Sequence, residues 1–315
     1  MKLLILGFML QAFGYLAIGK VVESFKDSCP DFFINDPSDQ NVHYPPTVLY
    51  DSQNPNRYKQ ICQQWNNEYR YATLYDTKGR IPVYSAYYYV GYHKVDKAEW
   101  KIEPQLDDPN LGPDMERENT IQTKDKGKNQ ALYGDYAFHT KDYTRGHLYP
   151  RCHNNDQDCA IATYTHTNAV PQTQADNNDW AHNVERKIEK IIQDNCDKGF
   201  AHVVTGAVPG QFWLDIKRDN IPVKEGVNIP EYFWTAYCCH DNESNALLSG
   251  AWLAKRNHKG LVVWKKTVKQ LEEELTKLYG NIEGEFIMFG GLCQGRIISR
   301  FYYALTNLYF NFFSN

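Results

Sequence analysis

Two stretches of the chain place apolar residues at the three-to-four-residue spacing of an amphipathic helix. In the first stretch the apolar positions are Trp180, Val184, Ile188, Ile191 and Ile192. These residues lie on one helical face and predict a helix from near Trp180 to about Asp194.

The second stretch has clearer end signals. Its apolar stripe is formed by Val268, Leu271, Leu275 and Leu278. Thr267 and Gln270 have the spacing of a capping box, and Gly280 stands where a C-cap is expected, so a helix is predicted between Thr267 and Gly280. A weaker helical spacing predicts a further helix over residues 57–65, with apolar positions at Tyr58, Ile61, Cys62 and Trp65.

Other segments are rich in β-branched and aromatic residues and predict strands. Residues 71–75 and 81–90, separated by a turn that contains a glycine, predict a β-hairpin. Four more predicted strands cover residues 202–205, 232–238, 261–264 and 285–289. The charged stretch 107–129 has few large apolar residues and predicts a surface loop. Because strands and helices mix without a regular βαβ alternation, an α+β fold is favoured.

The two ends of the chain differ from the rest. Lys2, an apolar run and small residues predict a cleavable secretory signal over residues 1–19, since the apolar run is shorter than the roughly 20 residues of a membrane span. Residues 20–56 form a polar N-terminal extension, and no linker or repeat divides the predicted domain at 57–300. The aromatic tail 301–315 is interrupted by polar residues. We therefore expect a secreted protein without a stable membrane anchor.

Cysteine usage fits that compartment. The chain has eight cysteines: Cys29, Cys62, Cys152, Cys159, Cys196, Cys238, Cys239 and Cys293. An even number in an oxidising compartment most simply means disulfides, although the spacing leaves their pairing open. Adjacent Cys238 and Cys239 would point to opposite faces of a strand, so we expect them to have different partners. The sequon at Asn242 is consistent with a secreted glycoprotein.

Charge and local chemistry point to a small polyanion site. The formal net charge of −4 argues against a surface that attracts nucleic acid as a whole, so such a site would be a local basic patch. In the segment TRGHLYP, His147 suits a general base because its ordinary pKa, about 6.5, leaves the ring largely neutral near pH 7. Arg145 offers a planar fork of donors to phosphate oxygens, and Gly146 leaves room for close approach. These residue types suit phosphodiester hydrolysis.

Such a reaction also needs positive charge at the leaving oxygen. A hard cation such as Mg²⁺, or alternatively Mn²⁺ or Ca²⁺, takes oxygen ligands, and Mg²⁺ often has few from the protein. Asn177, just before the helix expected near Trp180, is the candidate ligand. Glu185, about two turns along, would orient water around the ion. Asn177 has an alternative interpretation as a helix cap, a position that asparagine favours.

Three motifs resemble those of one nuclease family. TRGHLYP (144–150), TNAVPQ (167–172) and NNDWAHNVE (177–185) are similar to motifs of the secreted DNA/RNA non-specific endonucleases of the ββα-metal, or His-Me finger, superfamily, and within it of the animal endonuclease domain-containing 1 group. The resemblance also includes residues 61–89, 100–106, 202–210 and 229–238, and all these segments occur in family order. The resemblance implies a central antiparallel sheet flanked by helices, stabilised by disulfides, with the site on a strand-loop-helix unit.

The resemblance also implies roles. His147 would be the general base, Arg145 a contact to the phosphate and the transition state, and Asn177 the single direct Mg²⁺ ligand. Glu185 would act from beyond the direct ligands of the ion, and Asn168 would order the site on its substrate side. DNA and RNA would both be cut, because contacts confined to the phosphate backbone carry no sequence preference.

The chain departs from the family pattern at three places. Thr144 stands where the motif usually begins with aspartate, and Asp142 is positioned to compensate if both lie on one strand. An arginine common in the family near WKIEPQL is missing, with Lys97 or Lys101 as the substitute that would contact substrate. Glu185 also follows the tryptophan of NNDW by one residue more than expected.

Two other functions are compatible with the sequence. A catalytically weak or inactive binding or immune-related protein on a nuclease scaffold would fit Thr144 and the acidic charge. A zinc-dependent hydrolase would use the cluster His147, Cys152, His153 and Cys159. In an oxidising compartment, disulfides are the better interpretation of those two cysteines.

Overall fold

One antiparallel sheet organises the part of the chain that the computed structural model describes, residues 21–91, 97–137, 139, 141–244, 246–280 and 284–294. Its eight strands lie in the order β1-β2-β3-β4-β9-β12-β13-β14, and each neighbouring pair is antiparallel. The strands are β1 (Val21–Val22), β2 (Tyr58–Trp65), β3 (Glu68–Asp76), β4 (Ile81–Tyr89), β9 (Ala201–Val208), β12 (Tyr232–His240), β13 (Leu247–Asn257) and β14 (Gly260–Lys266). The predicted signal and aromatic tail fall outside the described residues.

Smaller elements surround this sheet. Three two-stranded antiparallel sheets are formed by β5 (Lys101–Ile102) with β6 (Glu116–Arg117), β7 (Thr144–His147) with β8 (Ala169–Gln172), and β10 (Phe212–Arg218) with β11 (Ile221–Ile229). The helices are α1 (Phe25–Ser28), α2 (Pro104–Asp107), α3 (Tyr133–Ala137), α4 (Gln157–Ala162), α5 (Gln174–Trp180), the π-helix η3 (Ala181–Glu185), α6 (Arg186–Asn195) and α7 (Val268–Tyr279). Short 3₁₀ turns are η1 (Pro30–Phe32), η2 (His166–Asn168), η4 (Asp197–Gly199) and η5 (Phe289–Gly291).

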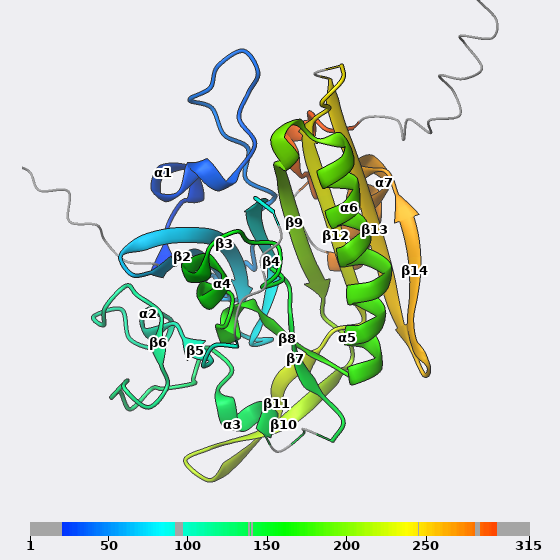
Figure 1. The fold of residues 1–315 in the computed structure, drawn as a ribbon. Coiled ribbons are helices and arrows are strands. Elements are labelled where there is room, and N and C mark those ends of the chain that lie inside the picture. The colour runs from blue at the N-terminus through cyan, green and yellow to red at the C-terminus, as the bar shows by residue number, and fades with distance from the viewer. Residues whose placement is uncertain are drawn as a thin grey trace, which may run out of the picture.

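The sheet separates two hydrophobic cores, because strand side chains alternate between its faces. Along β12, Phe233 and Tyr237 join the core under α5 and α6, whereas Trp234 and Ala236 join the core under α7. Figure 1 shows α5 and α6 running along one face of the β9–β14 half of the sheet, with α7 behind it. The predicted α+β architecture with a central antiparallel sheet is confirmed.

Most predicted elements match the structure. The 71–75 and 81–90 hairpin is β3–β4, and the strands near 202, 232 and 261 are β9, β12 and β14. Helix α7 has the predicted capping box, in which Thr267 Oγ1 accepts from the Gln270 backbone N–H. The 107–129 stretch is mostly loop, and it contains only the two-residue strand β6 and the end of α2.

Three local predictions are wrong. Residues 57–65 form strand β2 rather than a helix, because they pair with both β1 and β3 and local spacing cannot anticipate these partners. The helix expected from Trp180 begins earlier, at Gln174. Thr173 and Asp176 form a capping box at its N-terminus. Residues 285–289 form no strand and lead into the turn η5.

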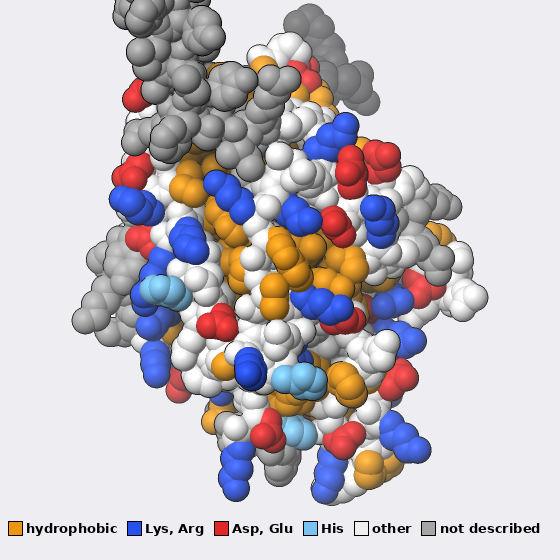
Figure 2. Space-filling view, turned by 90° about the vertical axis from the view of Figure 1, so that its right-hand side faces the viewer, with side chains coloured by type: hydrophobic (Ala, Val, Ile, Leu, Met, Phe, Trp, Pro, Cys, Tyr) orange, Lys and Arg blue, Asp and Glu red, His pale blue; other side chains and the backbone are white. Residues whose placement is uncertain are grey.

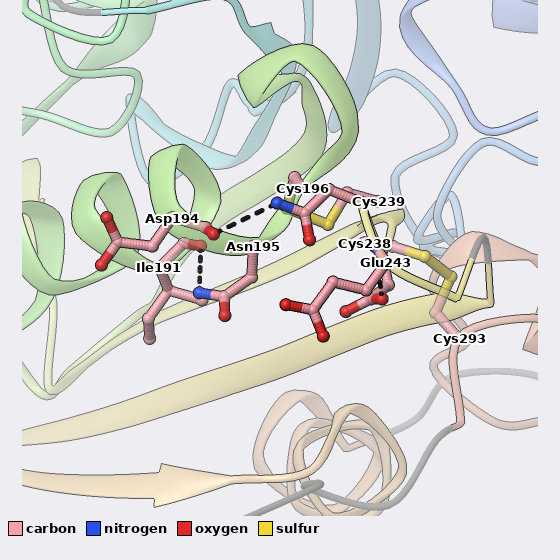
Figure 3. Close-up of a disulfide and its surroundings, with 10 residues drawn as sticks. Ile191, Asp194, Asn195, Cys196, Cys238, Cys239, Glu243 and Cys293 are labelled. Atoms are coloured by element: carbon pink, nitrogen blue, oxygen red, sulfur yellow. Dashed lines mark hydrogen bonds between the residues drawn. A yellow bond between two sulfur atoms is a disulfide. The ribbon is translucent and has the colours of Figure 1, made fainter. Parts of the chain in front are cut away.

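Disulfides attach three segments to the sheet. Cys29 bonds Cys62, which ties the N-terminal extension to β2. Cys196 bonds Cys239, and Cys238 bonds Cys293, so the two adjacent cysteines have different partners as predicted. Figure 3 shows these two bonds leaving β12 side by side toward opposite faces.

The disulfide prediction is wrong for the remaining pair, since Cys152 and Cys159 are both unpaired. Burial raises the pKa of each thiol to about 12, which keeps both protonated and unreactive near neutral pH. Among the described residues, no helix combines the length and apolar composition needed to cross a membrane.

Candidate functional site

The β7–β8 sheet sets the geometry of the TRGH segment. Arg145 lies opposite Pro171, and His147 lies opposite Ala169 in antiparallel register. Because strand side chains alternate, Arg145 and His147 share one face of β7, while Thr144 belongs to the other. Asp142 lies in a turn before the strand, so the predicted compensation for Thr144 along a shared strand face is not realised.

The Gln172 side chain lies so close to the Gly146 backbone that no larger residue fits at this position. A Cβ atom at this position would overlap Oε1 and Cδ of Gln172, whose side chain is buried. Neither polar atom of that amide has a hydrogen-bond partner among the described residues. The glycine therefore lets the Gln172 amide lie directly against β7, on the face opposite Arg145 and His147.

We expect Gly146→Ala to destabilise the protein by about 1–3 kcal/mol, because the added methyl group overpacks a buried contact. Thermal unfolding measures the effect. The double variant Gly146→Ala with Gln172→Ala removes the overlapping atoms and should recover part of the loss. If the double variant is no more stable than the single one, the overlap with Gln172 is not the cause.

His147 is half-buried in an aromatic setting. Its ring centroid lies 4.9 Å from that of Trp100 and 4.9 Å from that of Tyr164. Nε2 is buried without a hydrogen-bond partner among the described residues. Burial, with the charges of Arg151 and Arg145, lowers the pKa of His147 to about 3. The ring is therefore neutral over the whole physiological range, which is the protonation state that a general base requires.

Arg145 lies inside a cage of aromatic rings. Its guanidinium carbon is 5.0 Å from the ring centroid of Trp100, 4.7 Å from that of Tyr133 and 6.0 Å from that of Tyr136. Nη1 is buried and has no hydrogen-bond partner in the described part of the chain. Rings on several sides hold the cation by cation–π attraction and leave its donors for an anion.

Two further residues of this site were missed by the sequence analysis. His166 is 1 % exposed, stacks between Trp100 and Tyr136, and has no described partner for either ring nitrogen. Burial and the charge of Arg145 lower its pKa to about 3. Arg151 is near enough to influence the pKa of His147 and donates to Tyr164 Oη at 3.1 Å. The sequence offered one signal for Arg151, namely its position four residues after His147 in a basic segment. It offered no signal for His166.

Asn177 lies within α5 rather than before a helix. The N-cap is Thr173, so the alternative interpretation of Asn177 as a cap is wrong. Its side chain is half-buried and makes no hydrogen bond to the described residues, whereas the neighbouring Asp176 carboxylate pairs with Arg256 at 3.2 Å. A free amide oxygen held on a helix suits a cation that takes one protein ligand and keeps most of its water.

Glu185 ends the π-helix η3. Two α-helical turns take about 7.2 residues, and a π-turn absorbs roughly one more, so Glu185, eight residues on, returns to the helix face that carries Asn177. Burial outweighs the nearby charge of Arg186 and raises the pKa of the Glu185 carboxyl to about 8. Its charge also influences Cys152, so this carboxyl lies toward the loop that follows β7.

Two residues predicted to face substrate are turned inward. Lys101 is buried, and its ammonium donates to the carbonyl oxygens of Glu99 and Ile161 at 3.2 Å each. Asn168 is also buried, and its amide is fully used by Ser85, Tyr149 and Thr163. Both side chains are therefore engaged within the protein, and Asn168 holds the loop after β7 through its two bonds to the Tyr149 backbone.

The structure lends no support to the zinc interpretation. The described residues, which include His147, Cys152, His153 and Cys159, contain no group of three or more histidine, cysteine or acidic side chains placed to hold a metal. The His153 ring is engaged elsewhere, with Nδ1 3.0 Å from the hydroxyl of Tyr87.

A groove of about 490 Å³ adjoins the β7–β8 sheet. Its lining includes Tyr143, which precedes β7, Arg256, and Phe212 on β10. Arg256 pairs with Asp176 in α5, so the groove borders the helix that carries Asn177. Phe212, the first residue of β10, is 74 % exposed.

Comparisons with known proteins bear on these features. The model of the DNA/RNA non-specific endonuclease family matches residues 52–279. The human endonuclease domain-containing 1 protein is 33 % identical over 237 residues, covering 71 % of this chain and 43 % of the relative, and the mouse protein is 36 % identical over 185 residues, covering 57 % and 34 %. The chain thus spans less than half the length of these relatives. A solved EndoG/EndoGI complex, described as showing the mechanism of EndoG inhibition, contains a chain with a TM-score of 0.47 and 17 % identity over 70 % of this chain and 83 % of that one.

Proposed function

Because the chain belongs to the DNA/RNA non-specific endonuclease family, we propose that it is a secreted, divalent-metal-dependent nuclease that hydrolyses the phosphodiester bonds of DNA and RNA. The observation that carries the proposal is the pairing of a neutral, half-buried His147 with a caged Arg145 on one face of β7. His147 would serve as the general base, and Arg145 is a cation whose Nη1 donor has no partner among the described residues.

In this reaction His147 takes a proton from the water that attacks phosphorus. Arg145 donates to the phosphoryl oxygens, where negative charge develops in the transition state. A divalent cation, held by Asn177 and its own water molecules, would supply positive charge at the leaving 3′ oxygen. The aromatic rings around His147 and Arg145 exclude bulk water and so strengthen both interactions.

Substrate would continue from the β7–β8 sheet into the groove beside Tyr143 and Arg256. The exposed ring of Phe212 offers a face on which a base can stack whatever its identity. Arg151 would add positive charge near His147. Contacts of this kind read the backbone and the shape of a strand rather than its sequence, which fits a non-specific enzyme.

The cation can be tested separately from the base. We expect cleavage of plasmid DNA and of RNA to require Mg²⁺ and to stop with chelator. Asn177→Ala should raise the Mg²⁺ concentration needed for half-maximal rate by about 10–100-fold, because the single protein ligand is lost. Asn178→Ala, one residue along the same helix and bonded to Gln174, is the matched control. An unchanged Mg²⁺ requirement in Asn177→Ala would remove this residue from the cation site.

A binding protein without catalysis is the second candidate, and Thr144 is the observation in its favour. The register of β7 weakens that argument, because Thr144 lies opposite Gln172 and on the face away from His147. Thr144→Asp in the same cleavage assay separates the two functions. A silent wild type that Thr144→Asp activates would favour the binding protein.

A further inference from the structure

A second groove, of about 640 Å³, lies between α6 and the last strands of the sheet. Its floor is apolar, with Ile191 of α6 facing Trp252 of β13 and Val263 of β14. Its sides carry Lys187 and Lys190 from the helix and Lys265 from the strand. Figure 2 looks onto this side of the molecule and shows apolar side chains gathered with lysines and arginines around them.

The strand beside this groove is the open edge of the sheet. Among the described strands, β14 pairs only with β13 and is the last in the order. The Leu261 N–H points away from β13 and donates to Asp179 of α5 at 3.0 Å. Strand geometry turns the backbone groups of Val263 and Lys265 the same way, and their outward N–H groups have no hydrogen bond among the described residues. The outer edge of β14 is therefore hydrogen-bonded at Leu261 and unpaired, among the described residues, at Val263 and Lys265.

Apolar side chains make this edge unusual. Val262 and Trp264, on the other face of β14, are 40 % and 41 % exposed. Natural edge strands are commonly protected by charge, bulges or a covering segment, and an exposed apolar edge is a site where another strand can add.

The charge around the groove defines what would add. Lys187 and Lys265 have no ion-pair partner among the described residues, whereas Lys190 pairs with Asp194 at 3.1 Å. Three lysines and one aspartate give a local positive charge on a chain whose formal net charge is −4. An acidic segment would be complementary to it.

We propose that β14 and this groove bind an extended, acidic and apolar segment of a partner protein by strand addition. The segment pairs its backbone with Val263 and Lys265. Because strand side chains alternate between faces, its acidic side chains lie among the lysines on the groove side, and its apolar side chains cover Val262 and Trp264 on the other side. A nucleic acid would use the lysines, but it would not continue the strand pairing at the N–H groups of Val263 and Lys265. A second copy of this chain would bring like-charged lysines together.

The test uses a fluorescent synthetic peptide of alternating valine and glutamate, measured by anisotropy against the full chain. We expect binding, and we expect Lys187→Glu with Lys265→Glu to weaken it by about tenfold or more. Val263→Pro should weaken it similarly, because it removes an outward N–H without removing a bond to β13. Lys277→Glu, on the exposed side of α7, is the control and should bind as wild type. Thermal unfolding reports whether each variant is folded.

Other results would overturn the proposal. A peptide N-methylated along the edge-facing positions that binds as tightly as the parent would exclude strand addition. Equal binding of a valine–lysine peptide would exclude charge complementarity. If oligothymidylate with chelator, and not the peptide, loses binding in the lysine variants, the groove is a nucleic-acid site. Self-association in sedimentation that Val263→Pro abolishes would assign the edge to a second copy.

Discussion

His147→Ala is expected to lower the rate of DNA and RNA cleavage by about 10²–10⁴-fold, the usual contribution of a positioned general base. The reason is specific to this ring. Burial beside Trp100 and Tyr164, with two nearby arginine charges, lowers its pKa to about 3. A base is active in its deprotonated form, above its pKa, so this ring remains competent from mildly acidic to alkaline pH.

The measurement is the initial rate of plasmid and RNA cleavage with Mg²⁺, with circular dichroism as the check on folding. His240→Ala, at the exposed end of β12, is the matched control and should cleave at the wild-type rate. Wild-type cleavage by folded His147→Ala would show that another group activates water, and His166 would be the next residue to replace. A rate that falls sharply between pH 7 and 5 would also contradict the neutral, buried ring.

Removing the disulfide between Cys196 and Cys239 is expected to cost about 2–5 kcal/mol of unfolding free energy. The bond joins residues 43 positions apart, and it fixes the end of α6 to β12. Nearby, the Asn242 backbone N–H donates to the Asn195 carbonyl at 2.9 Å, which adds a second connection at this corner. Figure 3 shows the bond beside the last turn of α6.

Chemical denaturation of Cys196→Ala with Cys239→Ala measures this loss. Cys152→Ala, which removes an unpaired thiol, is the control and should cost less. Since α6 continues through η3 into α5, the double variant should also loosen Asn177 and raise the Mg²⁺ requirement. Stability equal to that of wild type under oxidising conditions would mean that this bond contributes no constraint on the unfolded chain.

The sequence correctly predicted the elements in which the end signals and the apolar periodicity indicate the same structure. Helix α7 has a capping box, an apolar stripe and a terminal glycine in register, and hairpin β3–β4 has two β-rich runs about a turn. Strand β2 shows the opposite case. Its residues have apolar spacing compatible with a helix, and pairing on both sides makes them a strand. For short apolar runs, the partner decides between the two structures.

The candidate site divides in the same way. Strand alternation in the TRGH segment was enough to expect Arg145 and His147 on one face, and the structure confirms this. Burial could not be predicted, and it moved Lys101 and Asn168 into the interior while bringing His166 beside Arg145. Whether a lysine or a histidine is buried depends on packing against residues that are distant in the sequence.

The amino-acid sequence alone was sufficient for the family, the α+β class and the separate partners of Cys238 and Cys239. These properties follow from residue types and from the fixed alternation of strand side chains. Which cysteines pair, which face Thr144 occupies, how deeply His147 is buried and which strand edge stays open were decided by tertiary structure. Each of these depends on register and packing between distant segments, and local sequence carries no information about either.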